Sequence, residues 1–195
     1  MNVAYINPFL TATTNVFQTM VKMPIRLGKP CLRDESQRLY KLCPLSAVIA
    51  LSGAANGVVV MCLTPRVALT MASALAGRTF EKVDDEVRDA LGEIVNMIAG
   101  SAKKDLPGGL VTISTPRLVD TAQVAYPAGR PVISIPFDTS VGRFIIEVSL
   151  KEEAAAQSPS SGGAAQGGSG AKTAAPAGNA AAPADGADST KKAAA

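Results

Sequence analysis

The chain contains no histidine and no tryptophan, and only 4% of its 195 residues are aromatic. The absence of histidine excludes Ser/His/Asp triads, imidazole acid–base catalysis and zinc sites that need an imidazole ligand. The loops GxGxxG and GxxxxGK[ST], which bind nucleotides, are also missing. Any activity of this chain must therefore run without the usual catalytic residues.

Charge and hydrophobicity exclude further classes. The 19 basic and 16 acidic residues give a formal net charge of +3, and no basic stripe is interleaved with aromatics, so nucleic-acid binding is not expected. No apolar run reaches the length of a membrane span, because ALSGAANGVVVMCL is interrupted by a turn signal. The first residues, MNVAYINPFL, lack the basic flank and apolar core of a signal peptide. We therefore expect a cytoplasmic protein.

Cysteine is also scarce. Cys31, Cys43 and Cys62 are odd in number, widely spaced and match no CxxC pattern. Buried, reduced thiols are the expected state of all three.

The composition divides the chain into two parts. Residues 152–195 are nearly all Ala, Gly, Ser and Pro, and all large aromatic side chains precede this segment. Such a segment has too little apolar surface to offset its ordering entropy, which predicts a disordered tail. Its role, whether a tether or a solubilising extension, stays open. Residues 1–151 are predicted to form one globular domain.

Three helices are predicted in this domain. Asn7 and Pro8 are suited to begin a helix over about 8–22, and Thr64-Pro65 to begin one that Gly77 ends. A long helix is predicted over about 84–105, with acidic residues in its first turn and Lys103-Lys104 near its end. Gly108-Gly109 breaks the long helix.

Strands account for the remaining apolar segments. An extended segment is expected over 25–33, and PLSAVIALSG and VVVMCL form a predicted hairpin whose loop contains Asn56-Gly57. LVTIST, VISIPF and RFIIEVSL are strand-like, and Glu147 and Ser149 lie on the opposite face from the apolar residues of the last strand. The sum is an α+β fold, an antiparallel sheet with two long helices and a shorter one packed on it.

The long helix carries an unusual polar face. Val87, Leu91, Ile94, Ile98 and Ala102 share one side of a helical wheel, and Asp89, Glu93, Asn96 and Gly100 lie on the other, with Gly92 on the flank. A polar residue on such a face is ordinarily just solvated. Glycine, however, costs a helix about 1 kcal/mol relative to alanine, so the two glycines suggest that this surface is kept low for a partner.

The pattern Asp89-x3-Glu93-x2-Asn96 resembles the signature of the CheC/CheX/FliY phosphatases, which dephosphorylate the response regulator CheY. The segments AYINPFLTATTNVFQTM and IPFDTSVGRFIIEVSL make residues 2–150 most similar to CheX. The family pattern continues to a downstream proline, and the spacing does not decide between Pro107 and Pro116. The resemblance implies a CheC-like α+β fold with pseudo-twofold internal symmetry, and a homodimer. A weak echo between NPFLTATTNVF and RDALGEIVNMI agrees with the symmetry, since Asn15 aligns with Asn96.

The resemblance also implies a mechanism. Asn96 would hold the water that attacks the aspartyl phosphate of a CheY-like receiver, and Glu93 would pair with the receiver's active-site lysine. Asp89, Gly92 and Gly100 would support docking. The chain itself would bind no metal, because the required Mg²⁺ belongs to the receiver. No nucleic acid and no membrane is expected as a partner.

Two other functions remain possible from the sequence. The chain could be a non-catalytic, receiver-binding adaptor of the flagellar-switch type, although an adaptor need not keep both Glu93 and Asn96. It could also be a dimeric structural protein. Which receiver is the substrate is not encoded in any motif found here.

Overall fold

The computed structural model describes residues 3–33 and 42–152. Three α-helices occur in these ranges: α1 (Asn7–Val16), α3 (Pro65–Ala76) and α4 (Asp85–Ala102). The strands are β1 (Arg26–Leu27), β2 (Cys31–Leu32), β3 (Leu45–Gly53), β4 (Ala55–Leu63), β5 (Val111–Ile113), β6 (Arg117–Asp120), β7 (Ile133–Thr139) and β8 (Gly142–Glu152). The predicted tail lies outside the described residues, apart from Glu152 at the end of β8.

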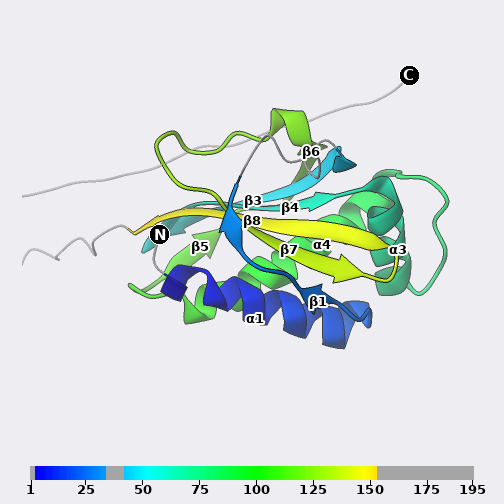
Figure 1. The fold of residues 1–195 in the computed structure, drawn as a ribbon, viewed down its shortest axis with the longest axis horizontal. Coiled ribbons are helices and arrows are strands. Elements are labelled where there is room, and N and C mark those ends of the chain that lie inside the picture. Colours follow the sequence, from blue (N-terminus) through cyan, green and yellow to red (C-terminus); the bar gives the residue numbers. More distant parts are fainter. Residues whose placement is uncertain (1–2, 34–41, 153–195) are drawn as a thin grey trace, which may run out of the picture. The chain divides into compact units, whose positions relative to one another are not determined.

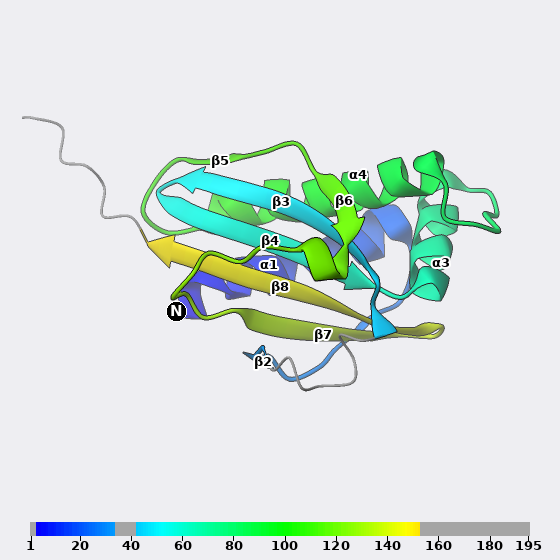
Figure 2. The same ribbon diagram turned by 90° about the horizontal axis from the view of Figure 1, so that it is seen from above.

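All strands join one antiparallel sheet in the order β1-β7-β8-β4-β3-β5, with β2 also pairing with β7 and β6 with β3. Helices α1 and α4 lie along the same face of this sheet (Figure 1), and α3 packs at one end (Figure 2). The segment from β6 to β7 crosses the opposite, outer face. The predicted α+β fold, with an antiparallel sheet and three helices, is confirmed.

The helix ends follow from capping chemistry. The Thr64 side chain accepts a hydrogen bond from the Val67 amide at the start of α3, and Gly77 ends that helix with a φ of 68°. The Asp84 carboxylate accepts from the Val87 amide, 3.1 Å away, at the start of α4. Helix α1 continues through a π-helical turn, Phe17–Val21, and stops at Lys22 in the left-handed conformation. These ends lie within a few residues of the predicted ones.

The β3–β4 hairpin forms, but the prediction of its loop was wrong. The turn is at Ala54, and Asn56 and Gly57 lie inside β4, where Gly57 pairs with Leu51. Gly57 has a φ of 155°, and a Cβ there would lie 1.9 Å from the Ser149 carbonyl oxygen of β8. The glycine is therefore required by the close approach of two strands rather than by a turn.

The inner core lies between the sheet and the two long helices. Phe144 stacks between Phe17 of the α1 extension and Phe137 of β7, with ring centroids 4.9 and 5.1 Å apart. The apolar side of α4 completes this core through Leu91, Ile94 and Ile98, which are fully buried. Burial of each such side chain stabilises the fold by roughly 1.5–3 kcal/mol, so α4 is held firmly with its polar side outward.

The outer face contains a buried polar network around Glu147. Its side chain is 0% exposed and accepts hydrogen bonds from Tyr126, from Ser134 at 3.2 Å and from the Cys62 thiol at 3.7 Å. The Arg33 guanidinium pairs with it at 3.3 Å and lies over the Tyr126 ring. The sequence placed Glu147 on this face, and tertiary contacts bury it by folding the segment before β7 across the sheet.

The cysteines differ in exposure. All three are free; Cys43 and Cys62 are buried beside this network, whereas Cys31 is exposed, so the expectation of burial was wrong for Cys31. The short strand β2 lies at the edge of the sheet, which leaves Cys31 accessible. Burial, reinforced by the Glu147 carboxylate, raises the pKa of Cys43 to about 11 and that of Cys62 well above its usual value.

Thiol labelling tests this arrangement. Because the thiolate is the nucleophile, a raised pKa and burial should both suppress reaction at pH 8. We expect the native protein to react quickly with one equivalent of iodoacetamide, at Cys31, and with three equivalents after unfolding in guanidinium chloride. Peptide mass spectrometry identifies the site, and the Cys31→Ser variant is the control. Rapid native labelling of Cys62 would contradict the burial.

No helix in the described ranges is both long and apolar enough to cross a bilayer.

Candidate functional site: a groove along α4

The polar side of α4 presents two parallel rows of side chains. Residues four apart are neighbours on a helix surface, so Asp85, Asp89 and Glu93 form an acidic row. Arg88, Gly92 and Asn96 form a second row beside it, which we call the inner row.

A segment of the same chain lies along the inner row. Residues Thr115, Pro116 and Leu118 face α4 and, with the two rows, enclose a groove of about 580 Å³. Pro116 Cγ and Leu118 Cδ1 lie 3.5 and 3.8 Å from the position that a Cβ on Gly92 would take. We call residues 115–118 the wall.

The pairing of β3 positions the wall. One end of β3 pairs with β6, where Ala47 faces Leu118, and the other end pairs with β5, where Leu51 faces Ile113. Between the two short strands the chain leaves the ladder, and the Ser114 hydroxyl accepts a hydrogen bond from the Ala50 amide at 3.0 Å. The wall is thereby anchored to the sheet on both sides of Pro116.

The predicted catalytic pair lies in this groove. Glu93 is exposed and Asn96 is half-buried, and both line the groove together with Asp89. Within the described ranges, neither Glu93 nor Asn96 has a side-chain hydrogen bond or ion pair. An exposed carboxylate and a nearby amide with no partner among the described residues are available to contact a second molecule.

The two glycines are placed differently from the expectation of a bare surface. Gly92 is buried beneath Pro116 and Leu118, so the wall of the same chain, rather than open solvent, covers this position. Gly100 is half-buried, has Ile113 Cδ1 at 3.9 Å from its Cβ position, and lies outside the groove. The sequence could not show that both glycines are covered, because the β5–β6 segment lies beside α4 only once β5 and β6 have paired with β3.

The structure also separates the two candidate prolines. Pro116 lines the groove, whereas Pro107 follows the turn after α4 and does not. Arg88, Thr115 and Leu118 line the groove as well and were not predicted. Arg88 could have been found from its position four residues before Gly92; the wall residues carry no local signal.

A metal site does not explain the acidic row. Within residues 3–33 and 42–152, no three Asp, Glu, Cys or His side chains gather closely enough to hold a metal ion.

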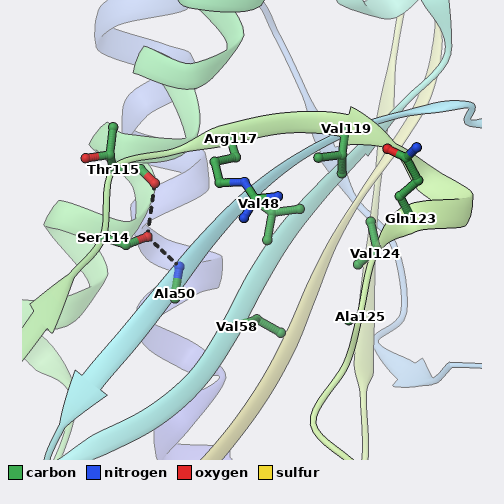
Figure 3. A pocket seen from close by; sticks show the side chains of 10 residues that line it. All are labelled: Val48, Ala50, Val58, Ser114, Thr115, Arg117, Val119, Gln123, Val124 and Ala125. Atoms are coloured by element: carbon green, nitrogen blue, oxygen red, sulfur yellow. Dashed lines mark hydrogen bonds between the residues drawn. The ribbon is translucent and has the colours of Figure 1, made fainter.

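A second cavity, of about 550 Å³, lies on the outer face of the sheet (Figure 3). Val48, Ala50 and Val58 form its floor, and Arg117 of β6 and Gln123 of the turn after β6 also line it. Its lining is mostly aliphatic, and it shares only Thr115 with the groove along α4. The groove is the better candidate for chemistry, because it combines carboxylates, an amide and a cation.

Comparisons with known proteins identify relatives with the same fold. Residues 45–138 match the family model described as chemotaxis phosphatase CheX. A CheC-like superfamily protein from Shewanella sp. PV-4 is 30% identical, with 77% of this chain and 99% of the other covered at a TM-score of 0.68. Chemotaxis protein CheX from Desulfovibrio desulfuricans is also 30% identical, with coverages of 76% and 99% and a TM-score of 0.65.

A more distant match shows the fold alone. The CheX–CheY complex of Borrelia burgdorferi with BeF3 and Mg²⁺ contains a chain that is 24% identical, with coverages of 76% and 98% and a TM-score of 0.65. No curated protein sequence matches the chain.

The fold and the 30% identity to the Shewanella protein thus define an α+β domain of the CheC-like superfamily. Within it, the chain belongs to the CheX family of chemotaxis phosphatases.

Substitution of Gly92 tests the packing of the wall. We expect Gly92→Ala to raise the free energy of unfolding by about 1 kcal/mol, because alanine favours the helix and its Cβ would make ordinary contacts with Pro116 and Leu118. Urea denaturation measures the change. Gly100→Ala on the same helix is the matched control and should behave alike. A less stable Gly92→Ala protein would show that the wall cannot accept one methyl group.

Proposed function

We propose that this protein hydrolyses the aspartyl phosphate of a phosphorylated, CheY-like receiver and so ends a chemotaxis or related two-component signal. The observation that carries the proposal is the pair Glu93 and Asn96, unpartnered within the described chain and lining one groove on α4. Membership of the CheX family supports the reaction class. The Borrelia CheX–CheY complex, whose chain shares this fold, supports a receiver as the partner.

Asn96 positions the attacking water. A side-chain amide has one acceptor oxygen and two N–H donors and does not take up a proton near neutral pH, so it orients water without acting as a base. Water adds to phosphorus, the bond between phosphorus and the receiver's aspartate oxygen breaks, and the products are the free carboxylate and inorganic phosphate. Such a reaction depends chiefly on alignment and charge neutralisation.

Glu93 sets the register of the two proteins. It lies one helical turn before Asn96 and pairs with the receiver's active-site lysine through a charge-assisted hydrogen bond. Asp89, one turn further, supports docking, and the wall at Pro116 limits how the receiver's loop can approach Asn96. Because α4 is fixed by its buried side, these groups meet the receiver as a rigid set.

The Asn96→Ala variant tests the chemistry. We expect it to lower the rate of receiver dephosphorylation on the order of 10²-fold, because the water loses its alignment, while circular dichroism and thermal stability stay unchanged. Glu93→Ala should weaken receiver binding by about 2 kcal/mol or more and should also lower the rate. Loss of ³²P from the phosphorylated receiver measures the rate of each variant, and its dependence on receiver concentration reports the binding. A wild-type rate in Asn96→Ala would overturn the mechanism.

The same assay distinguishes a receiver-binding adaptor. An adaptor would bind the phosphorylated receiver without accelerating loss of phosphate, and Asn96→Ala would then leave every measured rate unchanged.

The proposal also assigns the metal to the receiver. Mg²⁺ there would offset charge on the phosphoryl group as the bond breaks, so EDTA should stop the accelerated reaction without changing the melting temperature of this protein. Elemental analysis of the purified protein should find no stoichiometric metal. A tightly held metal near Asp89 and Glu93 would contradict the assignment and indicate a self-contained hydrolase.

A further inference from the structure

Arg88 is a cation of the groove that the proposed reaction does not use. It is half-buried on α4 and begins the inner row that continues through Gly92 to Asn96. The acidic row lies directly beside it. The groove therefore presents one positive charge, on Arg88, beside the negative charges of the acidic row on the same helix.

The Arg88 side chain has no acidic partner in the described part of the chain. Other arginines pair within the fold: Arg143 binds Asp138, with atoms 2.6 Å apart, and Arg78 binds Glu86. No carboxylate in the described ranges lies within the 4.0 Å ion-pair distance of Arg88, although it is close in sequence to Asp85 and Asp89. A guanidinium has five donors in a rigid fork suited to a carboxylate, and partial burial removes some of the water that would otherwise satisfy them.

Arg88 lies too far along α4 to act on the phosphoryl group. Asn96 lies eight positions further along the chain, which is about 12 Å along the helix axis. Long side chains on a helix also lean toward its N-terminus, which moves the guanidinium further from Asn96. Its charge is therefore available for docking rather than for chemistry.

We propose that Arg88 is a specificity-determining residue that pairs with a carboxylate on the surface of the receiver. This inference rests on the proposed function. The helix rise of five residues places that carboxylate on the order of 8 Å from the receiver lysine that meets Glu93. A receiver with a basic residue at that position would be repelled, so the groove selects partners by an ordered pair of opposite charges.

Steady-state kinetics test this role. With the receiver that wild-type protein dephosphorylates best, we expect Arg88→Glu to raise KM at least tenfold with kcat unchanged, and Arg88→Lys to retain part of the affinity. Arg66→Glu, an exposed residue on α3 outside the groove, makes the same change in net charge and should leave KM as in the wild type. Equal KM values for Arg88→Glu and Arg66→Glu, or a fall in kcat alone, would overturn the proposal.

A binding measurement separates this inference from the proposed hydrolysis. The probe is the host receiver that, loaded with beryllofluoride and Mg²⁺, binds the Asn96→Ala protein most tightly. It is titrated against the Asn96→Ala and Asn96→Ala/Arg88→Glu proteins by isothermal titration calorimetry. At least tenfold weaker binding of the double variant supports the role of Arg88 even if the wild type accelerates no hydrolysis. Restored binding after reversal of one receiver acid to arginine identifies the partner residue. Equal affinities, or no binding by either protein, would overturn the inference.

Discussion

The pairing of β3 with two separate short strands is the constraint on which the candidate site depends. Strand β5 takes one end of β3 and β6 takes the other. Between them the chain leaves the ladder and passes along α4, where Pro116 and Leu118 cover Gly92. Without this break the polar side of α4 would be an open helix surface. With it, Glu93 and Asn96 line a groove whose two sides are both attached to the same sheet.

A polar network on the outer face of the sheet helps to hold the segment that contains the wall. The segment that follows β6 crosses this face and is held by Tyr126, which donates to the buried carboxylate of Glu147. Arg33 adds an ion pair from the edge of the sheet. Removing one partner of a buried pair costs about 3–5 kcal/mol, because a charge is then left uncompensated. The network therefore fixes the path of the segment that begins at the wall.

The groove combines rigidity with unused polar groups. The apolar side of α4 is fully buried, whereas Arg88, Glu93 and Asn96 have no intramolecular partners in the described ranges. The proposed hydrolysis by alignment of water would require this combination, since a mobile helix would lose the geometry and internally paired side chains would have to break contacts to bind. The proposed docking to a receiver would satisfy all three groups at once and would link recognition to chemistry on a single helix.

The sequence by itself determined the three helices, the β3–β4 hairpin and the polar face of α4, because capping residues and apolar periodicity act over a few neighbouring positions. It also pointed to Glu93 and Asn96 through their place on the polar face and through the resemblance of Asp89-x3-Glu93-x2-Asn96 to a family signature. Tertiary structure decided which proline reaches the groove, what lies over Gly92 and why Gly57 is a glycine. Strand β6 was not predicted at all. Its four residues alternate little between apolar and polar side chains, and they form a strand because they pair with β3. Each of these features depends on contacts between segments far apart in the chain, and local sequence patterns do not record such contacts.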